Sequence, residues 1–298
     1  MQGRPEMWGN EIVIDEMSEE NIFEDKIAPP SIATEMPAAP ASADLLRTAA
    51  DPDLTEDLAL ALLKRADLHS EVIERLAKNT NALQSRKVKI ALVSHPHTPR
   101  HVSVPLARQF YTFDLMKVAL SPWVPADVKV AADDVLISRL KMVTIGERLT
   151  LARRASGRVA AALLLDGSIG GGGAGVLPVQ PGGTTSVAEI VARGTRVMRI
   201  ALENPRLTEA LVINSVLRSA AGAALVHAVA QHEKWSRRRE VRAALLRTQH
   251  LSLARALEFS SEIPPPVLRE LLASSRLPTK IKDQLLRQSQ GSPPPSRY

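Results

Sequence analysis

The chain has 298 residues, 45% of them hydrophobic, which is enough apolar material for one elongated domain or two compact ones. It contains no cysteine, which excludes disulfides, thiolate metal ligands and thiol catalysis and fits a reducing cytoplasm. The chain does not begin with a basic start and an apolar run, and no run of about 18 apolar residues occurs, so we expect a soluble cytoplasmic protein without membrane contact.

Residues 1–45 are predicted to form a disordered acidic leader. They carry ten acidic residues against two basic ones, Arg4 and Lys26, a net charge of −8, whereas residues 46–298 carry 36 bases and 22 acids, a net charge of +14. A segment of this charge, rich in Pro, Ala and Glu, has little means of folding alone. Two interpretations stay open: the leader contacts the basic body and competes there with an acidic partner, or it is a solubilising tail.

A recurring five-residue motif marks the turns of the body, residues 46–165 and 187–287. Its first residue is polar and its second is Pro; the third varies, the fourth is apolar or Thr, and the fifth is Thr or Pro. The four copies are "DPDLT" at 51–55, "HPHTP" at 95–99, "SPWVP" at 121–125 and "NPRLT" at 204–208. Pro ends the incoming helix, a final Thr suits an N-cap, and a final Pro suits the first helical turn. The motif therefore predicts a turn between two helices, pinned by its apolar residue.

The spacing of these turns predicts a repeat. The apolar turn residue recurs at intervals of roughly 14 residues. The series is Leu54 and Leu68 in the first part of the body, and Leu207, Ala221, Trp235, Leu251, Ile263 and Leu277 in the second. A short helix and its turn fill such an interval, so two make a helical hairpin of roughly 28 residues. Runs such as "LALALLKRA" have helical periodicity and strand signals are nearly absent. Turn positions between about 136 and 157 are not assigned by these patterns.

The stretch "HPHTPRH" places three histidines within seven residues, at His95, His97 and His101. A closed metal site needs about four ligands at fixed geometry, and neither a cysteine nor a neighbouring carboxylate completes one here. Since His95 and His97 fill the places of Asn204 and Arg206 in another copy of the motif, we expect a solvent-exposed turn rather than a metal centre.

Several aromatic and acidic residues have a structural and a functional interpretation. Trp235 falls on the apolar turn position and is predicted to be core, whereas Trp123 is unassigned. "FYTFD" at 110–114 predicts an apolar corner between helices, with an exposed ligand-binding cluster as the alternative. The acidic pair Asp133-Asp134 should face opposite ways on a helix and has no matching His or Lys motif. We therefore expect no catalytic residue, no enzyme activity, no cofactor and no metal.

Residues 166–186 and 288–298 are predicted to be a Gly/Pro-rich flexible loop and a disordered tail. The glycine run of the loop lacks the Lys followed by Ser or Thr that a phosphate-binding loop needs.

The basic residues define the candidate binding face. Basic residues recur at i+3 along one predicted helix and at i+4 along a later one, namely Arg193, Arg196 and Arg199, then Lys234, Arg238 and Arg242. These residues either solvate an outer face or form a positive strip for nucleic acid, for an acidic protein or for the leader.

The turns and helices together resemble the bacterial HEAT-like and leucine-rich-repeat-variant solenoids, in which similar turns connect short helices. "DPDLTEDLALALLKRADLHSEVIERLAKN" and "VMRIALENPRLTEALVINSVL" carry this resemblance. It implies an all-α solenoid of stacked helical hairpins that acts as a non-enzymatic scaffold for a protein or peptide partner. Nucleic-acid binding by an Arg-rich face, as in some HEAT-like DNA-repair proteins, is the alternative.

Overall fold

The computed structural model describes residues 42–166, 187–218 and 221–291, and the side chains of residues 43–166, 194–218 and 221–289. The chain divides into two units, Met1–Pro40 and Ala41–Tyr298, and all described residues belong to the second. Most of the predicted leader, loop and tail lies outside the described residues. The first helix begins at Ser42 and the last ends at Gly291, so each extends a few residues beyond the predicted boundary of the body.

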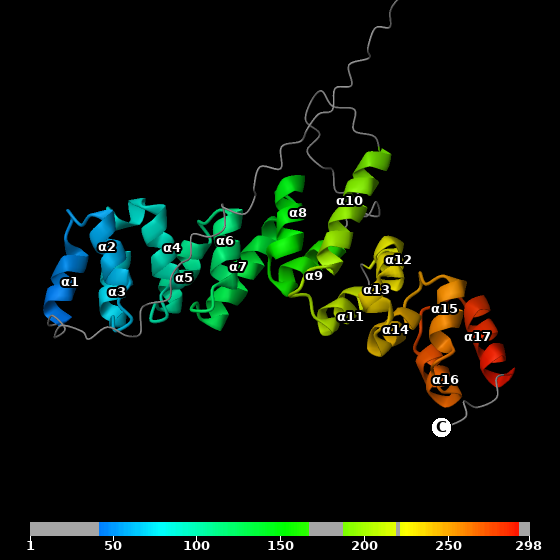
Figure 1. The fold of residues 1–298 in the computed structure, drawn as a ribbon. Helices are drawn as coiled ribbons and strands as arrows, with labels where there is room; N and C mark the ends of the chain where they lie inside the picture. Colours follow the sequence, from blue (N-terminus) through cyan, green and yellow to red (C-terminus); the bar gives the residue numbers. More distant parts are fainter. Residues whose placement is uncertain (1–41, 167–186, 219–220, 292–298) are drawn as a thin grey trace, which may run out of the picture. The chain divides into compact units, whose positions relative to one another are not determined.

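All regular secondary structure in the described ranges is helical, which confirms the predicted all-α fold class (Figure 1). Most helices have eight to ten residues. The α-helices are α1 Ser42–Ala50, α2 Glu56–Leu63, α3 Ser70–Ala77, α4 Arg86–Ser94, α5 Arg100–Ala107, α6 Thr112–Leu120, α7 Ala126–Arg139, α8 Ile145–Arg154, α9 Gly157–Leu165, α10 Val187–Leu202, α11 Glu209–Leu217, α12 Ala223–Gln231, α13 Glu233–Ser236, α14 Arg239–Leu246, α15 Leu253–Ser260, α16 Pro265–Ala273 and α17 Thr279–Gly291, with a 3₁₀ helix, η2, at Ala82–Gln84.

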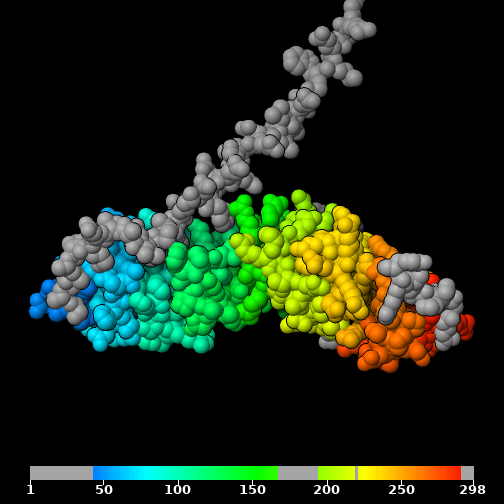
Figure 2. Space-filling view, turned by 60° about the horizontal axis from the view of Figure 1, so that its bottom comes forward, coloured from blue at the N-terminus to red at the C-terminus, as the bar shows by residue number. Residues whose placement is uncertain are grey.

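The helices pack on their near neighbours along the chain. Consecutive helices pair as hairpins, for example α4 with α5, α6 with α7 and α8 with α9. Helices two apart also pack together: α1 on α3, α2 on α4, α5 on α7, α7 on α9 and α8 on α10. Figure 2 shows the same order on the surface, where consecutive colours abut. This arrangement of local pairs in two alternating layers is consistent with a helical repeat.

The apolar residue of each turn lies in the core, as the motif predicts. Leu54, Leu68, Leu207, Leu251 and Leu277 are buried, and Ala221 and Ile263 are half-buried. Trp235 is 2% exposed and its indole N–H donates to the Leu202 carbonyl at 2.8 Å, which confirms its predicted core position. The turns therefore contribute apolar surface to the core as well as connecting the helices.

The last residue of the motif is the N-cap of the following helix. The Thr55 hydroxyl accepts a hydrogen bond from the Leu58 amide, as an N-cap should, whereas Thr208 has the N-cap position without that bond. Pro99 and Pro125 also lie at the N-cap, with ψ of 145°, so the expectation that they begin the first helical turn is wrong. Their fixed φ suits the extended backbone that leads into a helix as well as the helix itself.

Residues 136–157, which the sequence left unassigned, contain the end of α7, all of α8 and the start of α9. Thr144 and Glu147 form a capping box at the start of α8, and Ser156 caps α9. The buried side chains of Arg148 and Asp166 then form an ion pair of 3.2 Å between α8 and the end of α9. Within the described ranges, no helix combines the length and the apolar character that a membrane span requires.

Candidate functional site

In two copies of the turn motif the first residue, Asn204 or His95, forms a hydrogen bond to an earlier part of the chain, and Asn79 does so in a turn outside the motif. The Asn204 amide donates to the carbonyls of Ala152 and Ala155 at 2.8 and 3.1 Å, and its Oδ1 accepts from the Arg206 amide. Asn79 makes the same two kinds of bond, to the carbonyls of Ala49 and Asp51 and from the Asn81 amide. Each such side chain therefore caps its own turn and ties that turn to an earlier one.

His95 has the same structural role, so the prediction that its side chain is solvent-exposed is wrong. It is 4% exposed, its Nε2 lies 3.0 Å from the Arg65 carbonyl, and its Nδ1 accepts from the His97 amide. His97 is exposed, as predicted, with Nδ1 3.1 Å from the Leu68 carbonyl, and His101 lies beside Glu74. Among the described residues, no three His, Cys, Asp or Glu side chains are placed to hold a metal ion.

The two residues of the acidic pair lie in different surroundings, one buried and one exposed, although both bond the start of α9. The Asp133 carboxylate is buried and accepts a hydrogen bond of 2.8 Å from the Ser156 hydroxyl, and burial raises its pKa. The exposed Asp134 instead pairs with Arg158. Both carboxylates thus tie α7 to the start of α9.

The first half of the predicted basic face lies on one helix. Arg193, Arg196 and Arg199 all belong to α10, and the last two have exposed side chains. The side chain of Arg193 lies outside the described residues. The i+3 spacing therefore does place Arg196 and Arg199 on an exposed part of α10.

The second half does not lie on one helix, so the predicted i+4 series along a single helix is wrong. Lys234 belongs to α13, Arg238 is the N-cap of α14, and Arg242 lies within α14. The buried Trp235 lies in α13, which ends at Ser236, and α14 begins only after Arg238. Lys234 lies over the Trp235 ring at 4.2 Å, and Arg238 is exposed.

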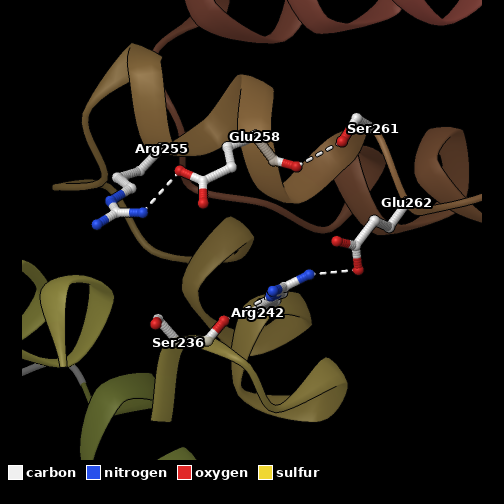
Figure 3. A network of polar contacts seen from close by, with 6 residues as sticks. All are labelled: Ser236, Arg242, Arg255, Glu258, Ser261 and Glu262. Atoms are coloured by element: carbon white, nitrogen blue, oxygen red, sulfur yellow. Dashed lines mark hydrogen bonds and ion pairs between the residues drawn. The ribbon is translucent and has the colours of Figure 1, made fainter. Parts of the chain in front are cut away.

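Arg242 is held in a network of polar contacts. Its guanidinium group donates to the Ser236 carbonyl at 2.5 Å and pairs with Glu262 (Figure 3). It also lies over the Phe259 ring, 5.4 Å from the ring centroid. Arg255 pairs with Glu258 beside it, and the Ser261 hydroxyl donates to the Glu258 carbonyl. Arg242 thus connects α14 to the turn between α15 and α16. Because a carboxylate already neutralises its charge, it adds little to an anion-binding surface.

The structure shows a second group of arginines that the sequence reasoning missed. Arg218, Arg247 and Arg276 are exposed, recur every 29 residues, and line one pocket of about 250 Å³. We name this the arginine pocket. Its other lining residues are Val216, Leu217, Ala221, Thr248, Gln249, His250 and Ser274. The signal in the sequence is the recurrence of "LRS", "LRT" and "SRL" at this period.

Hydrogen bonds between two turns fix the backbone of the arginine pocket. Arg218 and Arg247 are the C-caps of α11 and α14, and Arg276 precedes α17. The Arg276 amide donates to the Arg247 carbonyl at 3.0 Å, and the Ser275 hydroxyl donates to the Leu246 carbonyl at 2.7 Å. In the described parts of the chain, no carboxylate forms an ion pair with these three guanidinium groups.

Four exposed apolar side chains lie in or directly after two other turns, those between α5 and α6 and between α7 and α8. Tyr111, Phe113, Met142 and Ile145 are 72, 37, 86 and 41% exposed, and we name them the apolar turn patch. Arg139 joins the two turns by donating to the carbonyls of Arg108 and Phe110. "FYTFD" is thus divided: Phe110 is buried in the predicted corner, whereas Tyr111 and Phe113 are exposed. Trp123 is 39% exposed and lies apart from these turns in the sequence.

Comparison with protein-family models, with curated proteins and with solved structures finds no match to this chain. Its function is therefore inferred from its own residues and their arrangement.

Proposed function

We propose that the chain is a non-enzymatic scaffold of HEAT-like helical repeats that binds a protein partner. The observation that carries this proposal is the apolar turn patch. Single exposed apolar residues are common on soluble proteins, but four in or directly after two turns that Arg139 connects support an interaction surface. Aromatic residues and Met are enriched at protein interfaces, and the patch contains Tyr111, Phe113 and Met142.

The test compares the proteins that bind the full chain with those that bind Tyr111→Ser/Met142→Ser. Val267→Ser on α16 is the matched control, because Val267 is 44% exposed and lies outside the patch. We expect a partner that binds wild type and Val267→Ser and is lost, by about tenfold or more, from the double variant, as for a truncated interface anchor. The same set of proteins on all three chains would contradict the proposal.

Nucleic-acid binding is the second candidate function. The observation that favours it is the exposure of Arg196 and Arg199 on α10, with Lys234 and Arg238 exposed on the following helices. Phosphate contacts by such residues give affinity that falls steeply with salt concentration. Duplex DNA binding that is salt-dependent and weakened by Arg196→Gln/Arg199→Gln would identify this function.

A further inference from the structure

Resting on the proposed scaffold function, we infer that the arginine pocket binds an acidic peptide segment of the protein partner, with carboxylates at every third residue. The inference starts from the periodicity of the three arginines. Arg218, Arg247 and Arg276 occur once in each of three successive repeats. Packed helices lie about 8–10 Å apart, so corresponding residues of successive repeats present charge at about that interval.

An extended peptide matches this interval. A polyproline II chain rises about 3.1 Å per residue with three residues per turn, so side chains at i, i+3 and i+6 share one side about 9 Å apart. Carboxylates at those positions would each meet one guanidinium group. Arginine is suited to this contact because its planar group donates two parallel hydrogen bonds to a carboxylate.

The chemistry of the pocket lining supports a carboxylate ligand. The described lining residues include no Asp or Glu, so nothing acidic competes for the arginines there. The exposed Gln249 adds a neutral side-chain amide, whereas the Thr248 hydroxyl already donates to the Leu245 carbonyl. A positive pocket with such groups is the arrangement by which arginine clusters recognise acidic motifs.

The lack of aromatic side chains among the described lining residues of the pocket favours a peptide ligand over nucleic acid. Binding of single-stranded nucleic acid relies on aromatic side chains on which the bases stack. Among the described lining residues there is no Phe, Tyr or Trp. The exposed aromatic residues Tyr111 and Phe113 belong instead to the apolar turn patch, whose composition indicates a protein partner.

The turns that carry the arginines are held in place before any ligand binds. The bonds from the Arg276 amide to the Arg247 carbonyl and from Ser275 to Leu246 fix one turn against the next. The Lys282 ammonium group also donates to the Ser275 carbonyl at 2.6 Å. At Arg247 and Arg276 a ligand therefore meets a prearranged backbone, and ordering there is confined to the arginine side chains.

The experiment measures the binding of a labelled peptide with repeated Glu-Pro-Ala triplets to the full chain by fluorescence anisotropy. We expect Arg247→Gln/Arg276→Gln to weaken binding about tenfold or more, because two charge-assisted contacts are lost. Arg239→Gln is the matched control: Arg239 is exposed and begins α14, at the end opposite Arg247, and its replacement should leave affinity within about twofold. Thermal melts establish that all three proteins are folded.

Two further probes test the ligand class. A peptide with Gln in place of Glu should lose binding, and a peptide of the same composition with its Glu residues adjacent should bind more weakly than the periodic one. Equal affinity of wild type and the double arginine variant for the peptide overturns the inference. Binding of a single-stranded oligonucleotide in place of the peptide, if the double variant abolishes it, also overturns the inference. Tyr111→Ser/Met142→Ser should still bind the peptide, so failure of the pocket and failure of the scaffold proposal are distinguishable.

Discussion

At the scale of single residues, a buried polar side chain such as Asn204 both donates hydrogen bonds to an earlier part of the chain and accepts one within its own turn. Asn204 is 1% exposed and satisfies two carbonyls of an earlier turn and one amide of its own. Buried backbone groups that lack partners cost about 1–3 kcal/mol each, so this position needs a side chain that both donates and accepts. Asn, Ser and neutral His meet that requirement, and all three occur at it: Asn204, Ser275 and His95.

The bonds of His95 determine its protonation state. A backbone amide can only donate, so Nδ1, which accepts from the His97 amide, carries no proton, and Nε2 must carry the one donated to the Arg65 carbonyl. A second proton, on Nδ1, would break the hydrogen bond from the His97 amide and place a positive charge in a buried site. Burial accordingly lowers the pKa of His95 from its usual 6.5.

This lowered pKa makes folding stability depend on pH. Above about 6.5 the imidazole is neutral in both states; as the pH falls below that value, the unfolded chain takes up the proton first, so the free energy of unfolding decreases. His95→Asn should keep the turn, since Asn serves at the equivalent position 204, and should change stability by less than about 1 kcal/mol at pH 8.

Urea unfolding between pH 8 and pH 5.5 measures the effect. The free energy of unfolding should fall less over this range in His95→Asn than in wild type. Some dependence should remain, because burial also lowers the pKa of His232, whose Nδ1 accepts from the Lys234 amide. An unchanged pH dependence would show that His95 titrates alike in both states.

At the scale of elements, the start of α9 contacts the turn before α11. Gly157 is the first residue of α9, and a Cβ built there would lie 2.2 Å from the Arg206 carbonyl oxygen and 3.0 Å from a Leu211 methyl group. The bonds from Asn204 to Ala152 and Ala155 hold the same turn against the end of α8. A Cβ at position 157 would therefore collide with backbone that these bonds hold in place, so the position requires glycine.

Gly157→Ala should therefore lower the free energy of unfolding by about 1–3 kcal/mol through overpacking against backbone. Gly146→Ala is the control, because no heavy atom lies within 4 Å of its added Cβ and alanine favours the helix α8 by up to about 1 kcal/mol. Chemical denaturation measures both variants. Equal effects at the two sites would contradict the close contact between α9 and the turn.

The turns were predictable from sequence because Pro, Thr and the apolar residue act locally. Thr144 and Glu147 also form a local signal, a capping box, which the Pro-based motif overlooked. The 14-residue α7 lacked a clear apolar stripe, partly because its buried face includes Asp133. Partners distant in sequence were harder: the role of His95 depends on Arg65, and the arginine pocket is visible only when turns 29 residues apart are compared.

At the scale of the whole molecule, the packing of helices on their near neighbours determines which helices a destabilising substitution affects. Contacts join helices one to three places apart, as for α9 with α10 and α11 or α11 with α14, and proteins built this way have stabilities that sum over neighbouring repeats. Hydrogen bonds also join elements that are near in the chain, from Trp235 in α13 to Leu202 in α10 or from Ser275 to Leu246 in α14. A local defect should therefore loosen its own repeat before distant ones.

Trp235→Ala tests this expectation. Trp235 is among the largest fully buried side chains, so its removal should cost about 3–5 kcal/mol and leave a cavity beside the Leu202 carbonyl. Native-state hydrogen exchange should then quicken in α10 to α14, while amides of α2 to α5 keep their wild-type protection. Uniform acceleration along the described helices would instead mean that the repeats unfold as a single cooperative unit. Leu58→Ala, at a half-exposed position of α2, should leave the exchange of α10 to α14 unchanged. The principal helix contacts include none between α2 and α10 to α14.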